Sequence, residues 1–208
     1  MDGDWSKLNE IIEIAEKKEL ITILDDAHGD FVLGKDGRGT GEFFNVQKKL
    51  DVYISSLSKG LGSFGGYASG RKDLIDLCVN TSKAFIYTSA LPSSINQYSL
   101  KRFSSNREKY RKKLWKKINQ FHYRLNEIGL STASTSQIIQ IIVGSEKKVV
   151  EFSRFLMTKG IFAQAIRYPT VKKNQARIRI SISGWLSEKE IELSIQVLEK
   201  AKRRFNLN

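Results

Sequence analysis

The sequence predicts an α/β domain followed by a smaller α+β domain. In the first half, a helical pattern precedes two short apolar runs, Leu20–Leu24 and Val52–Ile54, and a glycine-rich loop separates the runs. Helix, strand, loop and strand in this order are typical of an α/β domain. A long basic helix and a second set of strands and helices follow. We place the boundary at Phe103, so that the two domains are residues 1–103 and 104–208.

The first domain is predicted to contain a helix and three strands. Trp5–Lys18 has the spacing of an amphipathic helix, with Asp4 as its N-cap. The residues expected to face inward are Trp5, Leu8, Ile11, Ile12 and Ala15. The continuous run LITIL, Leu20–Leu24, is typical of a strand buried on both faces of a parallel sheet. Val52–Ile54 and a run near Phe64–Ser69 are the other two predicted strands.

The second domain is predicted to alternate helices and strands. The predicted elements are a helix at Asn106–Ile128 ended by Gly129, a strand at QIIQIIVG, a helix at Glu146–Lys159 closed by Gly160, and strands at Ile161–Ile166 and Arg177–Ser183. The motif SEKE at Ser187–Glu190 has the pattern of a capping box, so it should open the last helix. Ile191, Ile195 and Leu198 are expected on the buried face of that helix.

The composition limits the class of protein. The chain has 208 residues and a single cysteine, Cys78, which excludes an intrachain disulfide and the common multi-cysteine zinc sites, so no metal is expected. No signal peptide is visible, and no apolar run approaches the ~20 residues that a membrane-spanning helix needs. The sequence therefore predicts a soluble, cytoplasmic protein without a membrane partner.

A basic segment raises the question of nucleic-acid binding. The net charge is +13, and nine lysines and arginines fall within Lys101–Lys117 against one acid, Glu108. Apolar residues with helical spacing in and after this segment place most of the cations on the other face of a helix. A nucleic-acid-binding module is one hypothesis. A solvated helix face is favoured over it, because no recognised binding motif accompanies the charges.

One lysine stands out among small residues. Lys59 lies in SSLSKGLGSFGGYASG, just after a predicted strand. It could be an exposed loop lysine, a phosphate-binding cation, or an amine that forms a Schiff base. A Walker loop is excluded because its motif is absent. Asp25 and His28 follow another predicted strand at the edge of the sheet where ligands bind in α/β proteins, although an aspartate there could simply cap a turn.

Four segments in order resemble a known enzyme group. They are DDAHGDFVLGKDGRG, DVYISSLSKGLGSFGGYASG, FIYTSALPSS and IRYPTVKKNQARIRIS. Together they are similar to the α-oxoamine synthase group of fold-type I pyridoxal-phosphate enzymes, and DDAHG and TSALPS are most similar to the members that act in biotin synthesis. The resemblance implies a pyridoxal 5'-phosphate enzyme that condenses an amino acid, such as alanine, with an acyl thioester such as pimeloyl-CoA and releases carbon dioxide. An aminotransferase or a glycine C-acyltransferase is the alternative within this class.

The resemblance also implies roles for single residues. Lys59 would form the Schiff base with the cofactor and move the substrate's α-proton, Asp25 would pair with the pyridine nitrogen, and His28 would contact the phenolic oxygen. Ser56 would bind the phosphate of its own subunit, whereas Thr88 and Ser89 would reach that of a neighbouring subunit, which implies a homodimer with shared sites. Arg179 would bind the amino-acid carboxylate, and Arg167 would lie near the substrate. Read without the motif, Ser56 could be a turn residue, Arg179 a strand-edge ion pair, and Thr88 and Ser89 helix caps.

The sequence also departs from the pattern of this group. Phe31 stands where the group has glycine, and Ser93 and Tyr168 stand where it has proline. The chain begins inside the group's motif Ser-Met-Asp-Gly-Asp and corresponds to the C-terminal half of members roughly twice as long. We therefore expect only the C-terminal part of the large cofactor-binding domain, together with the small domain. We also expect this piece alone to bind the cofactor poorly.

Overall fold

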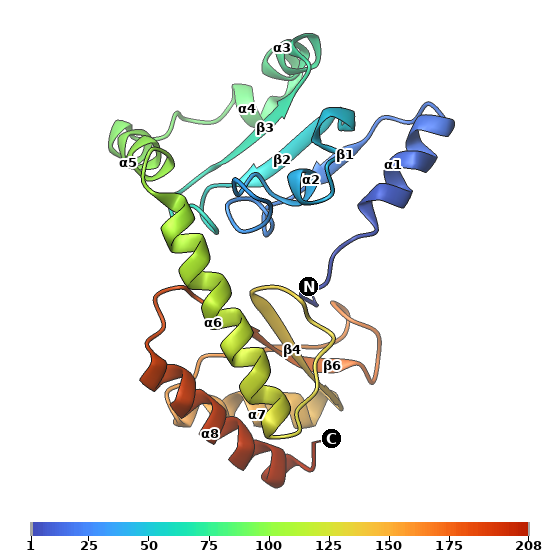
Figure 1. Cartoon of the computed structure of the whole chain (residues 1–208). Coiled ribbons are helices and arrows are strands. Elements are labelled where there is room, and N and C mark those ends of the chain that lie inside the picture. The colour runs from blue at the N-terminus through green and yellow to red at the C-terminus, as the bar shows by residue number, and fades with distance from the viewer. Residues whose placement is uncertain (1, 208) are drawn as a thin grey trace. The chain divides into compact units, whose positions relative to one another are not determined.

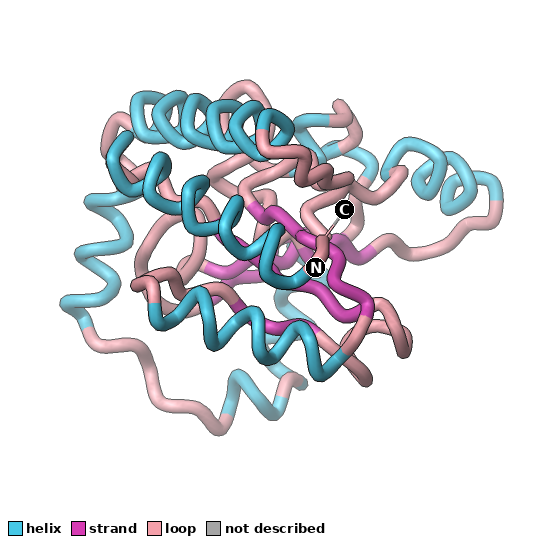
Figure 2. Tube along the Cα trace, turned by 90° about the horizontal axis from the view of Figure 1, so that it is seen from below, coloured by secondary structure: helices cyan, strands magenta, loops and turns pink. Residues whose placement is uncertain are grey.

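The computed structural model describes residues 2–207, which form two compact units. The N-terminal unit is Trp5–Arg111, and the C-terminal unit comprises residues 2–4 and 112–207 (Figure 1). The division falls inside helix α6 (Arg107–Glu127), somewhat beyond the Phe103 boundary that the sequence suggests. Figure 2 shows helices, in cyan, and strands, in magenta, alternating with long loops along the trace.

The N-terminal unit is built on a three-stranded sheet. Its strands are β1 (Ile23–Asp25), β2 (Val52–Ser56) and β3 (Gly66–Gly70), in that spatial order. β1 and β2 are parallel, whereas β2 and β3 are antiparallel. Its helices are α1 (Leu8–Lys17), α2 (Thr40–Phe43), the 3-10 helix η1 (Gln47–Lys49), α3 (Lys72–Thr81), α4 (Lys83–Ile86), α5 (Ser93–Phe103) and the first turn of α6.

The prediction that LITIL is a strand buried on both faces is wrong. The strand β1 begins only at Ile23, and Ile21 and Ile23 expose 76% and 65% of their surface. β1 lies at the edge of the sheet and, among the described strands, pairs only with β2. The run supplies apolar side chains suited to burial, but the described residues do not cover them.

The first helix is shorter than predicted. α1 begins at Leu8 with Lys7 at the N-cap position, so the prediction of an Asp4 N-cap is wrong. Leu8, Ile12 and Ala15 are buried as expected, and Leu8 and Ile12 pack in a small cluster with Val46. Ile11, which was expected to face inward, is exposed.

The C-terminal unit combines an antiparallel sheet with long helices. The sheet has the order β4 (Ile138–Gly144), β6 (Ala176–Ser181) and β5 (Gln164–Ile166), and the helices are the rest of α6, α7 (Glu146–Thr158) and α8 (Glu188–Phe205). These elements agree with the predicted order, although the strand expected at Ile161–Ile166 is confined to its last three residues. The capping box between Ser187 and Glu190 is confirmed.

Alternation along the strands gives this sheet one apolar and one polar face. Ile139 and Ile141 of β4 and Ile178 of β6 are buried in a core that also contains Phe121 of α6 and Leu198 of α8. The opposite face, on which Ile138 and Ile142 of β4 also lie, carries the polar side chains of these strands, because successive residues of a strand point to opposite faces. These polar residues are Gln140, Gln164, Arg177 and Arg179.

Candidate active site

Two predicted site residues lie at one edge of the N-terminal sheet. β1 ends at Asp25 and β2 ends at Ser56, and the two strands are parallel, so their carboxyl ends meet at the same edge. Asp25 pairs with Ile54, and Ser56 is two positions beyond Ile54. Because alternate residues share a face, Asp25 and Ser56 project from the same face of the sheet. We call this the front face.

The front face is open and bordered by small residues. The antiparallel register places Gly66 opposite Ser56 and Ala68 opposite Ile54. Asp25, Ile54, Gly66 and Ala68 are all exposed. A flat ligand could therefore lie against this face beside the Asp25 carboxylate.

A tight turn follows Asp25 and carries His28. The Asp25 carboxylate accepts a hydrogen bond of 3.1 Å from the backbone N–H of Ala27 and remains exposed. The turn continues with a bond of 3.0 Å from the N–H of Gly29 to the carbonyl of Asp26. His28 is exposed within this turn. Asp25 thus does cap a turn, as the simpler interpretation had it, while its carboxylate faces solvent.

Lys59 lies in a compact connection between β2 and β3. The N–H of Ser63 donates to the carbonyl of Leu57 over 2.8 Å, and the N–H of Gly62 donates to the carbonyl of Lys59 over 3.1 Å. Leu61 is buried and anchors the turn, whereas Lys59 is exposed. Gly62 has a φ of +70°, a conformation that favours glycine. The backbone of the turn is fixed while the amine of Lys59 is accessible.

The Ser56 hydroxyl faces this turn. Ser56 Oγ and Ser58 Oγ are 2.7 Å apart, and the N–H of Ser58 lies 3.3 Å from Ser56 Oγ. The two hydroxyls therefore stand together between the end of β2 and Lys59. Hydroxyl and backbone N–H groups in such a turn are suited to an anion such as phosphate.

The other predicted residues lie elsewhere. Thr88 and Ser89 are exposed in the segment between α4 and α5. Arg179 and Arg167 belong to the C-terminal unit. Arg179, on β6, is half-buried and donates a hydrogen bond to Gln164, and Arg167 is exposed just after β5. Among the predicted residues, Asp25 and Ser56 thus end the two parallel strands, and His28 and Lys59 follow them.

A polar network on the other face of the N-terminal sheet escaped prediction. Its members are Asp26, Asp30, Thr40, Tyr53, Ser55 and Tyr67. Burial raises the pKa of the Asp26 carboxyl above its ordinary value, whereas hydrogen bonds from Thr40 and Tyr53 act in the opposite direction. Burial and the neighbouring carboxyls also raise the pKa values of Tyr53 and Tyr67. The alternation of Tyr53 and Ser55 with apolar residues in β2 is the sequence signal that could have revealed this polar face.

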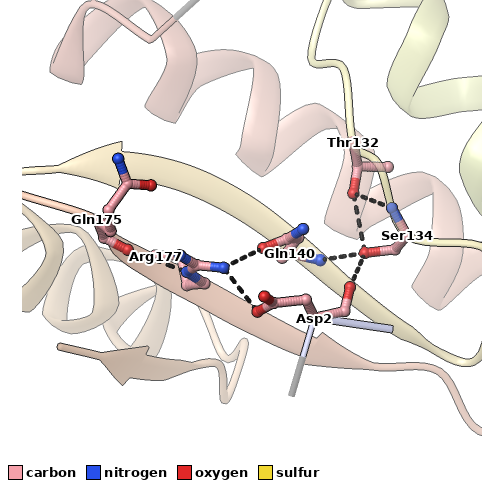
Figure 3. A network of polar contacts seen from close by, with 6 residues as sticks. All are labelled: Asp2, Thr132, Ser134, Gln140, Gln175 and Arg177. Carbon is pink, nitrogen blue, oxygen red and sulfur yellow. Dashed lines mark hydrogen bonds and ion pairs between the residues drawn. The ribbon is translucent and has the colours of Figure 1, made fainter. Parts of the chain in front are cut away.

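A second unpredicted polar network lies in the C-terminal unit (Figure 3). Arg177 is buried, forms an ion pair of 2.6 Å with Asp2, and donates to the Gln140 side chain over 2.7 Å. Ser134 Oγ donates to the carbonyl of Asp2 over 2.6 Å. These contacts hold the first described residues against the polar face of the β4–β6 sheet. Arg177 therefore serves the fold, although it shares the motif ARIR with Arg179.

Comparison with known proteins identifies the family. Residues 1–198 match the model of the family described as aminotransferase class I and II. The chain belongs to this family. It is 37% identical over 210 residues to the 8-amino-7-oxononanoate synthase of Thermoanaerobacter pseudethanolicus, covering 100% of this chain and 53% of that protein. It is 36% identical to that of Petrotoga mobilis, with 96% and 52% covered.

The chain thus spans about half the length of the curated relatives that it matches. Solved structures show the same fold at low identity. A serine palmitoyltransferase from Sphingomonas wittichii matches with a TM-score of 0.92 at 24% identity, over 99% of this chain and 53% of that one. The 8-amino-7-oxononanoate synthase of Francisella tularensis matches with a TM-score of 0.82 at 23% identity, over 100% and 61%.

These matches confirm the predicted fold class. The chain has a mixed α/β fold that matches about half the length of these fold-type I enzymes. The match of residues 1–198 to a class I and II aminotransferase model also confirms the resemblance drawn from the four sequence segments. Within residues 2–207, each helix is too short or too polar to cross a membrane.

Proposed function

We propose that this protein is a pyridoxal-phosphate-dependent acyltransferase of the α-oxoamine synthase group. The observation that carries the proposal is the position of Asp25 and Lys59. Asp25 ends β1, and Lys59 follows the end of β2, its parallel neighbour. A carboxylate and an accessible amine therefore stand at the same edge of the sheet, where α/β proteins bind their ligands.

The residues at this edge fit the chemical groups of the cofactor. The exposed Asp25 carboxylate suits a protonated ring nitrogen, and the hydroxyls of Ser56 and Ser58 suit a phosphate. Lys59 supplies an amine for the aldehyde. Gly66 and Ala68 leave room for a flat ring over the front face. When bound, the cofactor supplies an electron sink for the carbanion formed at the substrate's α-carbon.

Each residue then has a defined task. Lys59 would hold the cofactor through its aldehyde and would move the proton at the α-carbon of the amino acid. Asp25 would keep the ring nitrogen protonated, and His28, in the turn after Asp25, would orient the ring through its phenolic oxygen. Arg179 binds the carboxylate of the amino acid, a task for which a planar guanidinium is suited, and Arg167 contacts the substrate nearby.

The substrates are proposed from the relatives. Several relatives named 8-amino-7-oxononanoate synthase are 33–37% identical over the chain. We therefore favour alanine as the amino acid and pimeloyl-CoA, or the same acyl group on a carrier protein, as the thioester. The α-carbon forms a bond to the acyl carbon, the thiol leaves, and carbon dioxide is lost, as the resemblance implies for a step in biotin synthesis.

A homodimer with shared sites fits the exposure of the segment around Thr88. Every described residue of α3, α4 and α5 is at least partly exposed. Phe85 and Tyr87 expose 60% and 82% of their surface next to Thr88 and Ser89. Large apolar side chains gathered in this way favour burial against a second subunit. Thr88 and Ser89 would then reach the phosphate held by that subunit.

Covalent labelling tests the assignment of Lys59. The protein is incubated with pyridoxal phosphate, reduced with borohydride and mapped by mass spectrometry. We expect the pyridoxyl label on Lys59, and loss of that label in Lys59→Arg but not in Lys35→Arg, a control lysine that is also exposed. A label confined to other lysines would refute the assignment.

An aminotransferase is the second candidate, because the matching family model carries that description and the same lysine and aspartate serve both reactions. Release of coenzyme A and carbon dioxide from pimeloyl-CoA plus alanine supports the acyltransferase, whereas conversion of alanine to a 2-oxo acid supports the aminotransferase.

Nucleic-acid binding is disfavoured by the contacts of the basic segment. Arg107 stacks on Phe103, with 4.4 Å between its guanidinium carbon and the ring centre, Arg111 donates to the carbonyl of Lys35, and Lys117 is buried against Glu188. Several of the nine cations therefore serve intramolecular contacts. Salt-dependent binding to arbitrary DNA or RNA would revive this alternative.

A further inference from the structure

The polar network lies on the face of the N-terminal sheet opposite to the front face. Tyr53 and Ser55 alternate with Ile54 and Ser56 along β2, so they project to the other side. Tyr67 of β3 pairs with Ser55 and shares its face. We call this the rear face. The loop between Asp26 and Thr40 covers it, because side chains of this loop bond to all three residues.

Asp30 fastens this loop to both β2 and β3. Its side chain is buried, with only 4% of the residue exposed. Asp30 Oδ2 accepts hydrogen bonds from Ser55 Oγ over 2.6 Å and from the Tyr67 hydroxyl over 2.8 Å. A buried carboxylate that accepts two hydroxyl donors is held strongly, because each bond to a charged group contributes more than one between neutral groups.

The backbone at Asp30 contacts the lysine turn. A Cβ added to Gly60 would lie 2.5 Å from the carbonyl oxygen of Asp30 and 2.9 Å from the Cβ of Phe31. The backbone of the loop and that of the lysine turn are therefore too close for a side chain at position 60. Gly60 directly follows Lys59. The side-chain bonds of Asp30 hold this part of the loop in place. The loop backbone in turn limits the position of Gly60, the residue after Lys59.

The loop has an unfavourable backbone conformation at Phe31, next to this contact. Its φ is +64°, which is unusual for a residue with a bulky side chain. Its N–H donates to the carbonyl of Gly37 over 3.0 Å. Such a backbone conformation persists where surrounding contacts impose it. The hydrogen bonds of the buried Asp30 carboxylate, one residue before Phe31, are contacts of this kind.

We propose that Asp30, held by Ser55 and Tyr67, is a positioning residue that fixes the lysine turn from the rear face of the sheet. The catalytic consequence of this role rests on the proposed function of Lys59. Asp30 does not touch the reacting groups. It acts through the backbone contact with Gly60, which limits the positions available to the Lys59 amine.

The chain contains a matched pair for comparison. The Tyr53 hydroxyl donates to the Asp26 carboxylate over 3.0 Å on the same rear face, so Tyr53→Phe removes a bond of the same kind as Tyr67→Phe. Asp26 also accepts a bond from the N–H of Thr40, at the far end of the loop. Tyr53→Phe should therefore make the backbone at Thr40 more mobile, whereas Tyr67→Phe should make the backbone of the lysine turn more mobile.

Residue-resolved hydrogen exchange on the 208-residue chain without cofactor tests the proposal. The N–H groups of Gly62 and Ser63 report on the lysine turn, because both bond within it. We expect Tyr67→Phe and Ser55→Ala to raise their exchange rates about fivefold, the factor expected for loss of one buried hydrogen bond. We expect Tyr53→Phe to raise the exchange rate of Thr40 instead.

Two results would overturn the proposal. One is that the exchange rates of the Gly62 and Ser63 N–H groups do not change in Tyr67→Phe and Ser55→Ala. The other is that Tyr53→Phe raises these two rates by the same factor. If Tyr67→Phe does not fold, the exchange rates in Ser55→Ala decide.

A second measurement tests the consequence for Lys59. With pyridoxal phosphate and borohydride, the rate of labelling of Lys59 relative to Lys35 should fall in Tyr67→Phe and Ser55→Ala, and an unchanged ratio counts against positioning.

Failure of this proposal can be told apart from failure of the proposed function. If the unsubstituted protein carries no label on Lys59 even with pyridoxal phosphate in large excess, which offsets weak binding by this piece, the proposed function fails. The exchange rates of Gly62 and Ser63 do not depend on that result, and they alone then decide whether Asp30 fixes the turn.

Discussion

Arg179 donates a hydrogen bond of 2.9 Å to the side chain of Gln164, and the two residues pair across the neighbouring strands β6 and β5. Both lie on the polar face of the C-terminal sheet. The neutral amide orients the planar guanidinium without cancelling its charge. This arrangement suits a residue that must present a guanidinium to a carboxylate in one orientation.

Replacing Arg179 by lysine should weaken amino-acid binding. A lysine keeps the charge but loses the planar pair of donors, so we expect KM for the amino acid to rise about tenfold with a smaller change in kcat. Steady-state kinetics with the amino acid varied checks this in the active enzyme. Arg203→Lys is the control, because Arg203 is exposed on α8 and pairs with Glu199. An unchanged KM in Arg179→Lys would remove Arg179 from the substrate site.

Replacing Asp25 by asparagine should abolish most turnover while leaving Lys59 able to bind the cofactor. A neutral amide does not hold a proton on the ring nitrogen, so the carbanion loses stabilisation, and we expect a loss on the order of 100-fold in kcat. Borohydride labelling of Lys59 should persist in the same variant. Asp36→Asn, in the same loop region and exposed, should retain activity. Turnover near that of the unsubstituted enzyme in Asp25→Asn would show that another acid, or none, performs this task.

The buried Asp26 should give the protein a measurable pH dependence. Because burial raises its pKa above 3.8, the folded state binds this proton more tightly than the unfolded state does. The contribution of Asp26 to the free energy of unfolding therefore falls as the pH rises from 3.8 towards the folded-state pKa. The variant Asp26→Asn carries an amide at this position, which does not titrate. Urea unfolding at several pH values should show the unsubstituted protein losing stability relative to Asp26→Asn as the pH rises, and a relative gain would contradict the prediction.

The exposed apolar residues before and at the start of β1 should cause self-association of the chain. Leu20, Ile21 and Ile23 are exposed beside an edge strand, and such edges pair with other chains. We expect Ile21→Lys to reduce light scattering at equal protein concentration. Leu193→Lys places the same charge at an exposed apolar residue of α8 and should have a smaller effect. Equal scattering by Ile21→Lys and the unsubstituted chain would show that these residues do not drive association.

Local patterns predicted much of the C-terminal unit. The run QIIQIIVG forms β4, the Ser187 capping box opens α8, and Ile191 and Ile195 are buried on its inner face. Capping and amphipathic spacing depend on residues three or four positions apart, so the sequence contains the whole signal. Four ordered motifs likewise singled out Asp25, which ends β1, and Lys59, which follows the end of the parallel strand β2.

Other features depended on partners that no local pattern specifies. LITIL has the composition of a doubly buried strand, yet Ile21 and Ile23 are exposed, because composition records a preference for burial and not which segment covers the strand. The role of Asp30 became visible only when the fold brought Ser55 and Tyr67 to its carboxylate. The sequence by itself determined the local elements and the reactive side chains at their ends. The tertiary structure decided which distant donors hold the buried carboxylates, because a hydrogen bond depends on distance and direction in space and not on separation along the chain.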